Sequence, residues 1–141
     1  MHNQTRTARA RSVQTFSAWS VAADSSWHFH WTFGADDAAF EGHFPQQPVL
    51  PGVFLIEMAE RAALFALERS GATGVRMTRV ERFRFAKPVA PGDQCELTLQ
   101  LPDLAFSASG PLRVAAAFHS AGVPVANGTL ALVAASNHEH L

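Results

Sequence analysis

The stretch PGVFLIEMAERAALFALERSG, residues 51–71, decides which fold this chain can adopt. Pro51 suits the start of a helix, and Gly71 suits the position just past its end. We therefore predict a helix from Gly52 to Ser70, about five turns and about 28 Å long. Its first half is apolar nearly all round, from Val53 onward, so this part of the helix should be buried on every side.

Segments with a period of two flank this helix. Before it, the aromatic residues of WHFHWTF (27–33) alternate with His28, His30 and Thr32, which predicts a strand with one aromatic face. After it come four strand candidates, at 75–89, 94–101, 112–120 and 123–135. The turn Pro91-Gly92-Asp93 separates the first two, and SAGV (120–123) predicts a short hairpin between the last two. We expect these four strands to meander.

A strand, a long buried helix and then several strands indicate the α+β class with an antiparallel sheet. One flat sheet would leave such an apolar helix half covered. We therefore expect a curved sheet around the central helix, closed off by a second copy of the chain.

Composition narrows the class of protein further. The chain has 141 residues, a formal net charge of −1 and one cysteine. This length fits a single domain, which we place at residues 14–136, between a flexible N-terminal arm (1–13) and a tail (137–141).

One cysteine excludes an internal disulfide framework, and nothing supplies a clear third metal ligand beside His28 and His30. We expect a cytoplasmic protein with no membrane span, since no apolar run is long enough and no signal-peptide pattern follows the basic start.

Two titratable residues are candidates for proton transfer. His43 lies in a loop stiffened by three prolines, and histidine suits a general base near neutral pH. Glu57 lies within the apolar half of the helix, where burial would favour its protonated form and a role as an acid. Taken alone, a histidine such as His43 is more often a surface or hydrogen-bonded loop residue, and Glu57 would more often reach solvent or pair with Arg61 one turn on.

The helix start is the third candidate feature. The first N–H groups of a helix have no intrahelical partner, and the helix dipole makes this end positive. Gly52 has no side chain to block a close approach, so a carbonyl oxygen docked there would be polarised.

The motif Phe40-Glu41-Gly42-His43-Phe44-Pro45-x-x-Pro48-Val49-Leu50-Pro51-Gly52-Val53-x-x-x-Glu57 closely resembles the signature of hotdog-fold 3-hydroxyacyl-acyl-carrier-protein dehydratases of bacterial fatty acid synthesis. A second motif, Arg84-Phe85-x-Lys87-Pro88-Val89-x-Pro91-Gly92-Asp93, resembles the same family further along the chain. The resemblance implies the hotdog fold, in which two protomers share one continuous sheet, as a dimer or a trimer of dimers.

The resemblance also implies a reaction. His43 would remove a C2 proton from a (3R)-3-hydroxyacyl thioester, and Glu57 of the other protomer would help the 3-hydroxyl leave as water. Gly52 would hold the thioester carbonyl, with Pro51, Val53 and Phe44 contacting the substrate. The product would be a trans-2-enoyl thioester, and the reaction would need no cofactor and no metal.

Basic residues are concentrated between positions 76 and 87, where Glu81 is the only acidic residue among five basic ones. Within this segment, the predicted docking patch for an acidic acyl carrier protein consists of Arg79, Arg82, Arg84 and Lys87. Nucleic acid is disfavoured as a partner because the chain as a whole is not basic.

The sequence departs from the family pattern at three positions. Glu60 and Arg61 replace the usual Ala-Gln after the catalytic acid, and Gln46 replaces a glycine. These changes favour a specialised pathway, such as polyketide or polyene synthesis, over general fatty acid elongation. Two alternatives stay open: an acyl thioesterase of the hotdog fold, and a catalytically silent subunit that binds an acyl chain or a carrier.

Overall fold

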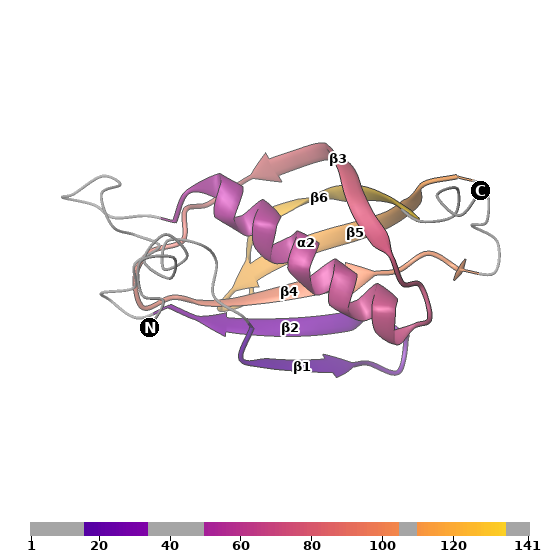
Figure 1. Cartoon of the computed structure of the whole chain (residues 1–141). Helices are drawn as coiled ribbons and strands as arrows, with labels where there is room; N and C mark the ends of the chain where they lie inside the picture. Colours follow the sequence, from indigo (N-terminus) through magenta and orange to yellow (C-terminus); the bar gives the residue numbers. More distant parts are fainter. Residues whose placement is uncertain (1–15, 34–49, 105–109, 135–141) are drawn as a thin grey trace, which may run out of the picture.

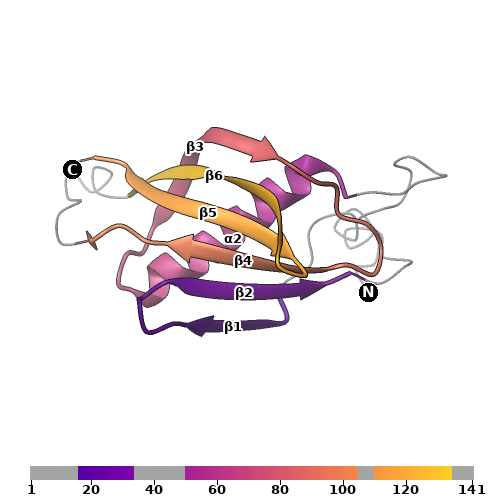
Figure 2. The same cartoon turned by 180° about the vertical axis from the view of Figure 1, so that it is seen from behind.

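The computed structural model of the chain describes residues 16–33, 50–104 and 110–134. The elements, in chain order, are β1 (Ala18–Val21), β2 (Trp27–Thr32), α2 (Gly52–Arg69), β3 (Val75–Phe85), β4 (Gln94–Gln100), β5 (Leu112–Ser120) and β6 (Val123–Ala134). The six strands form one antiparallel sheet in the order β1-β2-β4-β5-β6-β3. Helix α2 lies across one face of this sheet (Figure 1), and the view from behind shows the opposite face (Figure 2). The predicted α+β class, with one long helix on an antiparallel sheet, is confirmed.

The hydrophobic core lies between α2 and the sheet. The side of α2 that faces the sheet is rich in small residues, which lets the helix approach the strands closely. Its buried residues are Leu55, Met58, Ala59, Ala62, Ala63, Ala66 and Leu67. The predicted alternation within strands is confirmed in β4, where Cys95, Leu97 and Leu99 are buried and their neighbours are less so.

The prediction that the first half of the helix is buried on every side is wrong for the single chain. Val53 is 63% exposed, and the side chain of Glu57 is 37% exposed. The reason is geometric, because one sheet covers one side of a helix and leaves the other side open. The helix bounds agree with prediction to within one residue at the C-terminal end.

The strands after the helix do not all meander as predicted. β4, β5 and β6 pair in sequence order, but β3 lies at the far edge of the sheet and pairs with β6 (Figure 1). The chain then returns from β3 to β4, which lies beside β2. Two hydrogen bonds anchor this return to the end of β2: Phe33 N–H donates to Asp93 O at 3.2 Å, and Gly92 N–H donates to Phe33 O at 2.7 Å.

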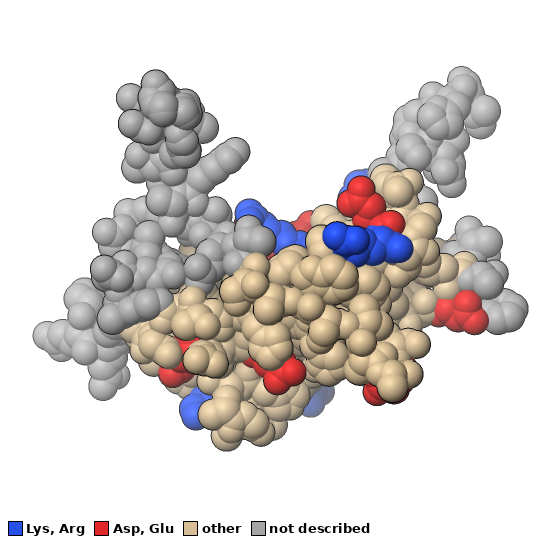
Figure 3. All heavy atoms as spheres, turned by 90° about the horizontal axis from the view of Figure 1, so that it is seen from below, with Lys and Arg blue, Asp and Glu red and all other residues tan. Residues whose placement is uncertain are grey.

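Strand β1 was not predicted from the sequence. All four of its residues are exposed, so no alternation of buried and exposed positions marked it. It pairs with β2 along its whole length, and Trp19 also stacks on Trp27 with 5.5 Å between ring centroids. The side of the molecule on which β1 lies is mostly uncharged, with a few acidic and basic groups scattered over it (Figure 3).

None of the predicted domain boundaries is tested, because residues 1–15 and 135–141 are outside the described part. Within the described residues, no helix is both long enough and apolar enough to cross a membrane.

Candidate active site

A groove of about 480 Å³ opens at the N-terminal end of α2. Leu50, Gly52 and Leu55 line one wall, and residues 85–89 line the other. The N–H of Leu50 donates to the carbonyl of Val89 at 2.8 Å, which holds the two walls together. We call this hollow the inner groove. Its mostly apolar walls suit a ligand with a hydrophobic part.

Gly52 is in close contact with the ring of Phe85 across this groove. A Cβ atom built on Gly52 would lie 2.9 Å from both Cε1 and Cζ of that ring, closer than real Cβ contacts. Only glycine therefore lets the ring rest on the first turn of the helix. Phe85 is itself half exposed, so its ring forms an outer part of the wall.

The first turn of α2 has no capping side chain. Pro51 is the N-cap residue, with an extended backbone, and the first turn contains no acidic residue. The N–H groups of Gly52 and Val53 lack intrahelical partners because of their position in the helix. The positive end of the helix dipole is therefore not offset by a carboxylate of this turn.

Glu57 lies one turn further along, on the side of α2 that the sheet does not cover. It is four residues after the exposed Val53, so the two share one helix face. Its Oε2 accepts a hydrogen bond from Nη2 of Arg61 at 3.1 Å. Both side chains are more than a third exposed, and an exposed pair at this spacing contributes only about 0.3–0.5 kcal/mol. The carboxylate is thus accessible and held by a pair that opens at little cost.

The predicted base lies outside the described residues, as does Phe44. The described part therefore contains Glu57 and the Pro51-Gly52-Val53 helix start, but not His43. The catalytic roles of all these residues stay predictions.

The one cysteine of the chain, Cys95, is buried in β4. Burial raises the pKa of the Cys95 thiol to about 12, with a smaller contribution from the negative charge of Asp93. The thiol therefore stays protonated and is a poor nucleophile. Within residues 16–33, 50–104 and 110–134, no cluster of three His, Cys, Asp or Glu side chains could hold a metal ion.

Comparison with known families gives a match over residues 19–117, to the ApeI-like family, described as ApeI dehydratase. This match includes the described elements from the second residue of β1 to Ala117 in β5, and it leaves out the end of β5 and all of β6. The chain belongs to the ApeI-like dehydratase family. The resemblance to hotdog dehydratases that the two motifs predicted is thereby confirmed at the level of the family.

Curated relatives resemble this ApeI-like chain over a shorter stretch. The 3-hydroxyacyl-(acyl-carrier-protein) dehydratase FabZ of Allorhizobium ampelinum is 45% identical over 65 residues, which is 44% of this chain and 42% of the relative. FabZ of Paramagnetospirillum magneticum is 50% identical over 60 residues, or 39% and 37% of the two chains. The matched part thus spans only about two fifths of these relatives.

Solved structures share the fold over most of the chain. A chain of the dehydratase heterocomplex ApeI:P from Xenorhabdus doucetiae has a TM-score of 0.66 and 22% identity, covering 83% of this chain and 95% of that one. A hypothetical thioesterase with coenzyme A from Streptococcus pneumoniae has a TM-score of 0.65 and 10% identity, covering 86% and 91%. At these identities the likeness supports the hotdog fold and nothing finer.

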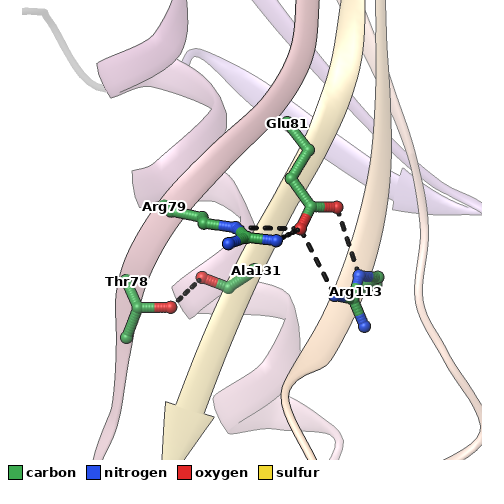
Figure 4. A network of polar contacts seen from close by, with 5 residues as sticks. All are labelled: Thr78, Arg79, Glu81, Arg113 and Ala131. Carbon is green, nitrogen blue, oxygen red and sulfur yellow. Dashed lines mark hydrogen bonds and ion pairs between the residues drawn. The ribbon is translucent and has the colours of Figure 1, made fainter.

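The four cations of the predicted carrier patch have different surroundings in this member of the ApeI-like family. Arg79 donates to Oε2 of Glu81, and Arg113 of β5 donates to both carboxylate oxygens of the same residue (Figure 4). The hydrogen bonds that Glu81 accepts lower its pKa to about 2, and the bond from Arg113 contributes more than the bond from Arg79. Arg79 therefore shares the single negative charge of Glu81 with Arg113, which balances only part of its positive charge.

The other three cations of the patch face two different hollows. Lys87 lines the inner groove beside Gly52. Arg82 and Arg84 line a separate hollow that none of the residues of α2 reaches. A carrier that contacted all four basic residues would have to bind around the β3 edge of the sheet.

One cluster that the sequence did not single out lies near the turn between β1 and β2. Oγ of Ser26 is 2.8 Å from Nε2 of His28, and Oε2 of Glu96 is 3.4 Å from Nδ1. This order of hydroxyl, imidazole and carboxylate is the one that serine hydrolases use. Here the Ser26 hydroxyl donates to Oδ1 of Asp24 at 2.7 Å and lowers its pKa, and Ser26 is only 2% exposed. The cluster therefore braces a turn and has no accessible nucleophile.

Proposed function

We propose that this chain dehydrates (3R)-3-hydroxyacyl thioesters on an acyl carrier protein to trans-2-enoyl thioesters, in fatty acid synthesis or a related polyketide or polyene pathway. His43 acts as the base at C2, and Glu57 of a second copy acts as the acid at the 3-hydroxyl. The dehydratase family supports the reaction type. The names of the FabZ relatives support the carrier-bound substrate, although the match covers only part of their length.

A single observation carries the proposal best. α2 exposes an apolar residue, Val53, and a carboxylate, Glu57, on one face beside the inner groove, while its opposite face is packed in the core. A second copy seated on this face would bury Val53 and bring Glu57 toward the groove of its neighbour. The inner groove then takes the acyl chain, and the N–H groups at Gly52 polarise the thioester carbonyl.

The ion pair with Arg61 bears on the acid role of Glu57. A carboxyl group that donates a proton to a leaving hydroxyl must reach that hydroxyl, and the ion pair with Arg61 competes with this contact. Because the pair is exposed and contributes little, substrate binding can open it. The same ion pair favours the second candidate, a silent subunit that binds acyl chains, if it persists when substrate is bound.

The direct test is turnover of a panel of 3-hydroxyacyl thioesters of different chain length, followed by mass and by absorbance of the conjugated product. Wild-type protein should lose one water per thioester, and His43→Ala and Glu57→Gln should each abolish this reaction. Glu60→Gln is the matched control, since it removes a carboxylate from the same helix and should keep activity. Release of free thiol without enoyl product would instead indicate a thioesterase.

Mixing two inactive variants tests whether the base and the acid come from different copies. Dissociated His43→Ala and Glu57→Gln chains are combined and allowed to reassociate. In a mixed dimer one of the two sites has both groups intact, so about a quarter of wild-type activity should return. No recovery, with mixed dimers present, would contradict the shared site.

The carrier docking role of Arg79, Arg82, Arg84 and Lys87 also remains a proposal. Lys87 is the cation placed beside the inner groove, so Lys87→Gln should raise the KM for a carrier-bound substrate. It should leave the KM for a small thioester mimic without a carrier unchanged.

A further inference from the structure

A second hollow, of about 570 Å³, lies on the other face of the sheet. We call it the outer groove, and its polar lining consists of Arg82, Arg84, Thr98, Gln100, Asn127 and Thr129. Thr98 and Gln100 alternate along β4 with the buried Leu97 and Leu99, so they point away from α2. The outer groove is thus separated from the inner groove and from Glu57 by the sheet itself.

A bulge in β3 brings the two arginines to this groove. Glu81 pairs with Thr129 and Arg84 with Asn127, so β3 uses one more residue than β6 over the same length. Arg82 takes up the extra residue with a φ of 55°, a conformation that is unusual for a residue other than glycine. Bulges of this kind redirect side chains and are frequent beside functional sites.

Gly128 of β6 makes the bulge possible. A Cβ atom at this position would lie 2.7 Å from Cα of Phe83, so any side chain would collide with the bulged strand. Phe83 occupies the space and packs against the core, while the residues on either side of it line the outer groove. The positive φ of Arg82 and the absence of a side chain at Gly128 together place Arg82 and Arg84 at the outer groove.

The charge of these two arginines is not balanced locally. Glu81, their acidic neighbour in β3, is engaged by Arg79 and Arg113 (Figure 4). In the described part of the chain, no carboxylate forms an ion pair with Arg82 or Arg84. Within the described residues, the outer groove therefore combines two guanidinium groups that have no ion pair with hydroxyl and amide groups from β4 and β6.

We propose that the outer groove binds the phosphate group of a small phosphate ester. Each guanidinium group can form two parallel hydrogen bonds with phosphate oxygens. Two guanidinium groups can therefore bind more oxygens than the two that a carboxylate ligand has, which favours a phosphate. The alanines at 115 and 117 form a low floor that leaves room for the organic part of the ester. The volume lies within the range of small-molecule sites. This site is independent of the proposed dehydration, because it lies on the opposite face of the sheet.

Calorimetric titration of the full-length protein at low salt tests the proposal, with adenosine 5′-monophosphate and inorganic phosphate as probes. Wild-type protein should bind the ester with one site per chain, and inorganic phosphate should compete. The double variant Arg82→Asn/Arg84→Gln should bind at least about tenfold more weakly. Asparagine is chosen at position 82 because it tolerates a positive φ. Arg76→Gln is the matched control, since it removes a charge from the same strand outside the groove and should keep the affinity within about twofold.

A second variant protects the test against misfolding. Ala117→Leu fills the floor of the groove and keeps both arginines, so it should weaken binding of the ester more than binding of inorganic phosphate. Thermal unfolding of each variant checks that the fold is intact. Equal affinity of the wild type and the double variant would overturn the proposal, as would no saturable binding of either probe.

Two other occupants give different results. If an acidic carrier protein binds through Arg82 and Arg84 while neither phosphate probe does, the groove is a protein docking surface and the proposal is wrong. If copies of the chain associate through this face, light scattering should show that the double variant has a different oligomeric state. Loss of probe binding when the wild-type chains associate would then also overturn the proposal. Dehydration by wild-type protein is measured separately, so failure of one proposal does not depend on the other.

Discussion

The two ends of α2 differ in how completely the rest of the chain covers them. At the C-terminal end, Ala62, Ala66 and Leu67 are fully buried, and the ring of Phe65 packs edge-on against three other aromatic rings. At the N-terminal end, one face stays open and a groove lies beside the first turn. A single helix therefore contributes stability at one end and an accessible, polarised surface at the other. Substitutions at the two ends should separate these contributions.

The largest effect on stability should come from Phe29→Ala, in the aromatic cluster around the C-terminal half of α2. Phe29 is fully buried, and its ring lies 4.8 Å from that of Phe16 and 6.1 Å from that of Phe65. Loss of such a side chain lowers the free energy of unfolding by about 3–5 kcal/mol, which urea denaturation would measure. Val53→Ala, at the open end, is the comparison and should lower it by much less, because Val53 is 63% exposed in the single chain and only a second copy would cover it. Equal losses would show that the two ends are equally packed.

At the open end, Gly52→Ala should reduce activity far more than stability. The new Cβ displaces the Phe85 ring, which can turn toward solvent, so the free energy of unfolding should fall by less than about 1 kcal/mol. The thioester carbonyl would be misplaced, and dehydration should slow about tenfold or more. Gly110→Ala is the control, because nothing lies near its Cβ position. Unchanged turnover in Gly52→Ala would place the carbonyl site elsewhere.

Arg69, which lies over the aromatic cluster, contributes less to the stability of the fold than Phe29 does. The guanidinium carbon of Arg69 lies 4.8 Å from the Trp19 ring centroid and 4.6 Å from that of Phe65. Arg69→Gln should therefore lower the free energy of unfolding by about 0.5–1 kcal/mol without changing dehydration. Arg69→Lys should restore part of the loss. A drop in turnover instead would mean that this end also contacts substrate.

The Glu81 network that ties β3 to β5 should show a pH dependence. The pKa of Glu81 in the folded state, about 2, lies below its ordinary value of 4.5, so the carboxylate stabilises the fold above pH 4.5. This contribution should fade as the pH drops from about 4.5 to 2. The stability difference between wild type and Glu81→Gln, followed by urea denaturation across this range, should shrink accordingly. Because Arg79 and Arg113 are 66% and 52% exposed, salt should also reduce the difference.

The smallest effect should come from Arg61→Gln, which removes the exposed partner of Glu57. The free energy of unfolding should fall by only a few tenths of a kcal/mol, as for other helix pairs at this spacing. Dehydration should not fall, because the pair opens when Glu57 acts as an acid. A strong loss of turnover with unchanged stability would instead make Arg61 part of the reactive site.

Much of the architecture could be predicted from local patterns. The helix bounds followed from Pro51 and Gly71, and β4 followed from alternating apolar residues. Such signals are local because each depends on residues within a few positions of one another. β1 was missed for the same reason, since its four exposed residues depend on β2 and on Trp27 for their structure.

The chemistry of the site was only partly accessible from the sequence. The sequence placed Glu57 and Gly52 in the correct helix. It did not predict that Glu57 is partly exposed in the single chain, because the hydrophobicity of a helix does not show which of its faces the sheet covers. The cations of β3 were recognised as a group. Their separation into an Arg79 paired with Glu81, an inner Lys87 and an outer pair depends on the bulge and on partners in β5 and β6.

By itself, the sequence determined the helix, most of the strands and the family, because periodicity, turn residues and motif spacing are properties of contiguous residues. Only the tertiary structure decided that β3 pairs with β6, that Gly128 accommodates the bulge, and that two arginines line a hollow on the face away from α2. These features arise from contacts between residues far apart in the chain, and no local pattern encodes them.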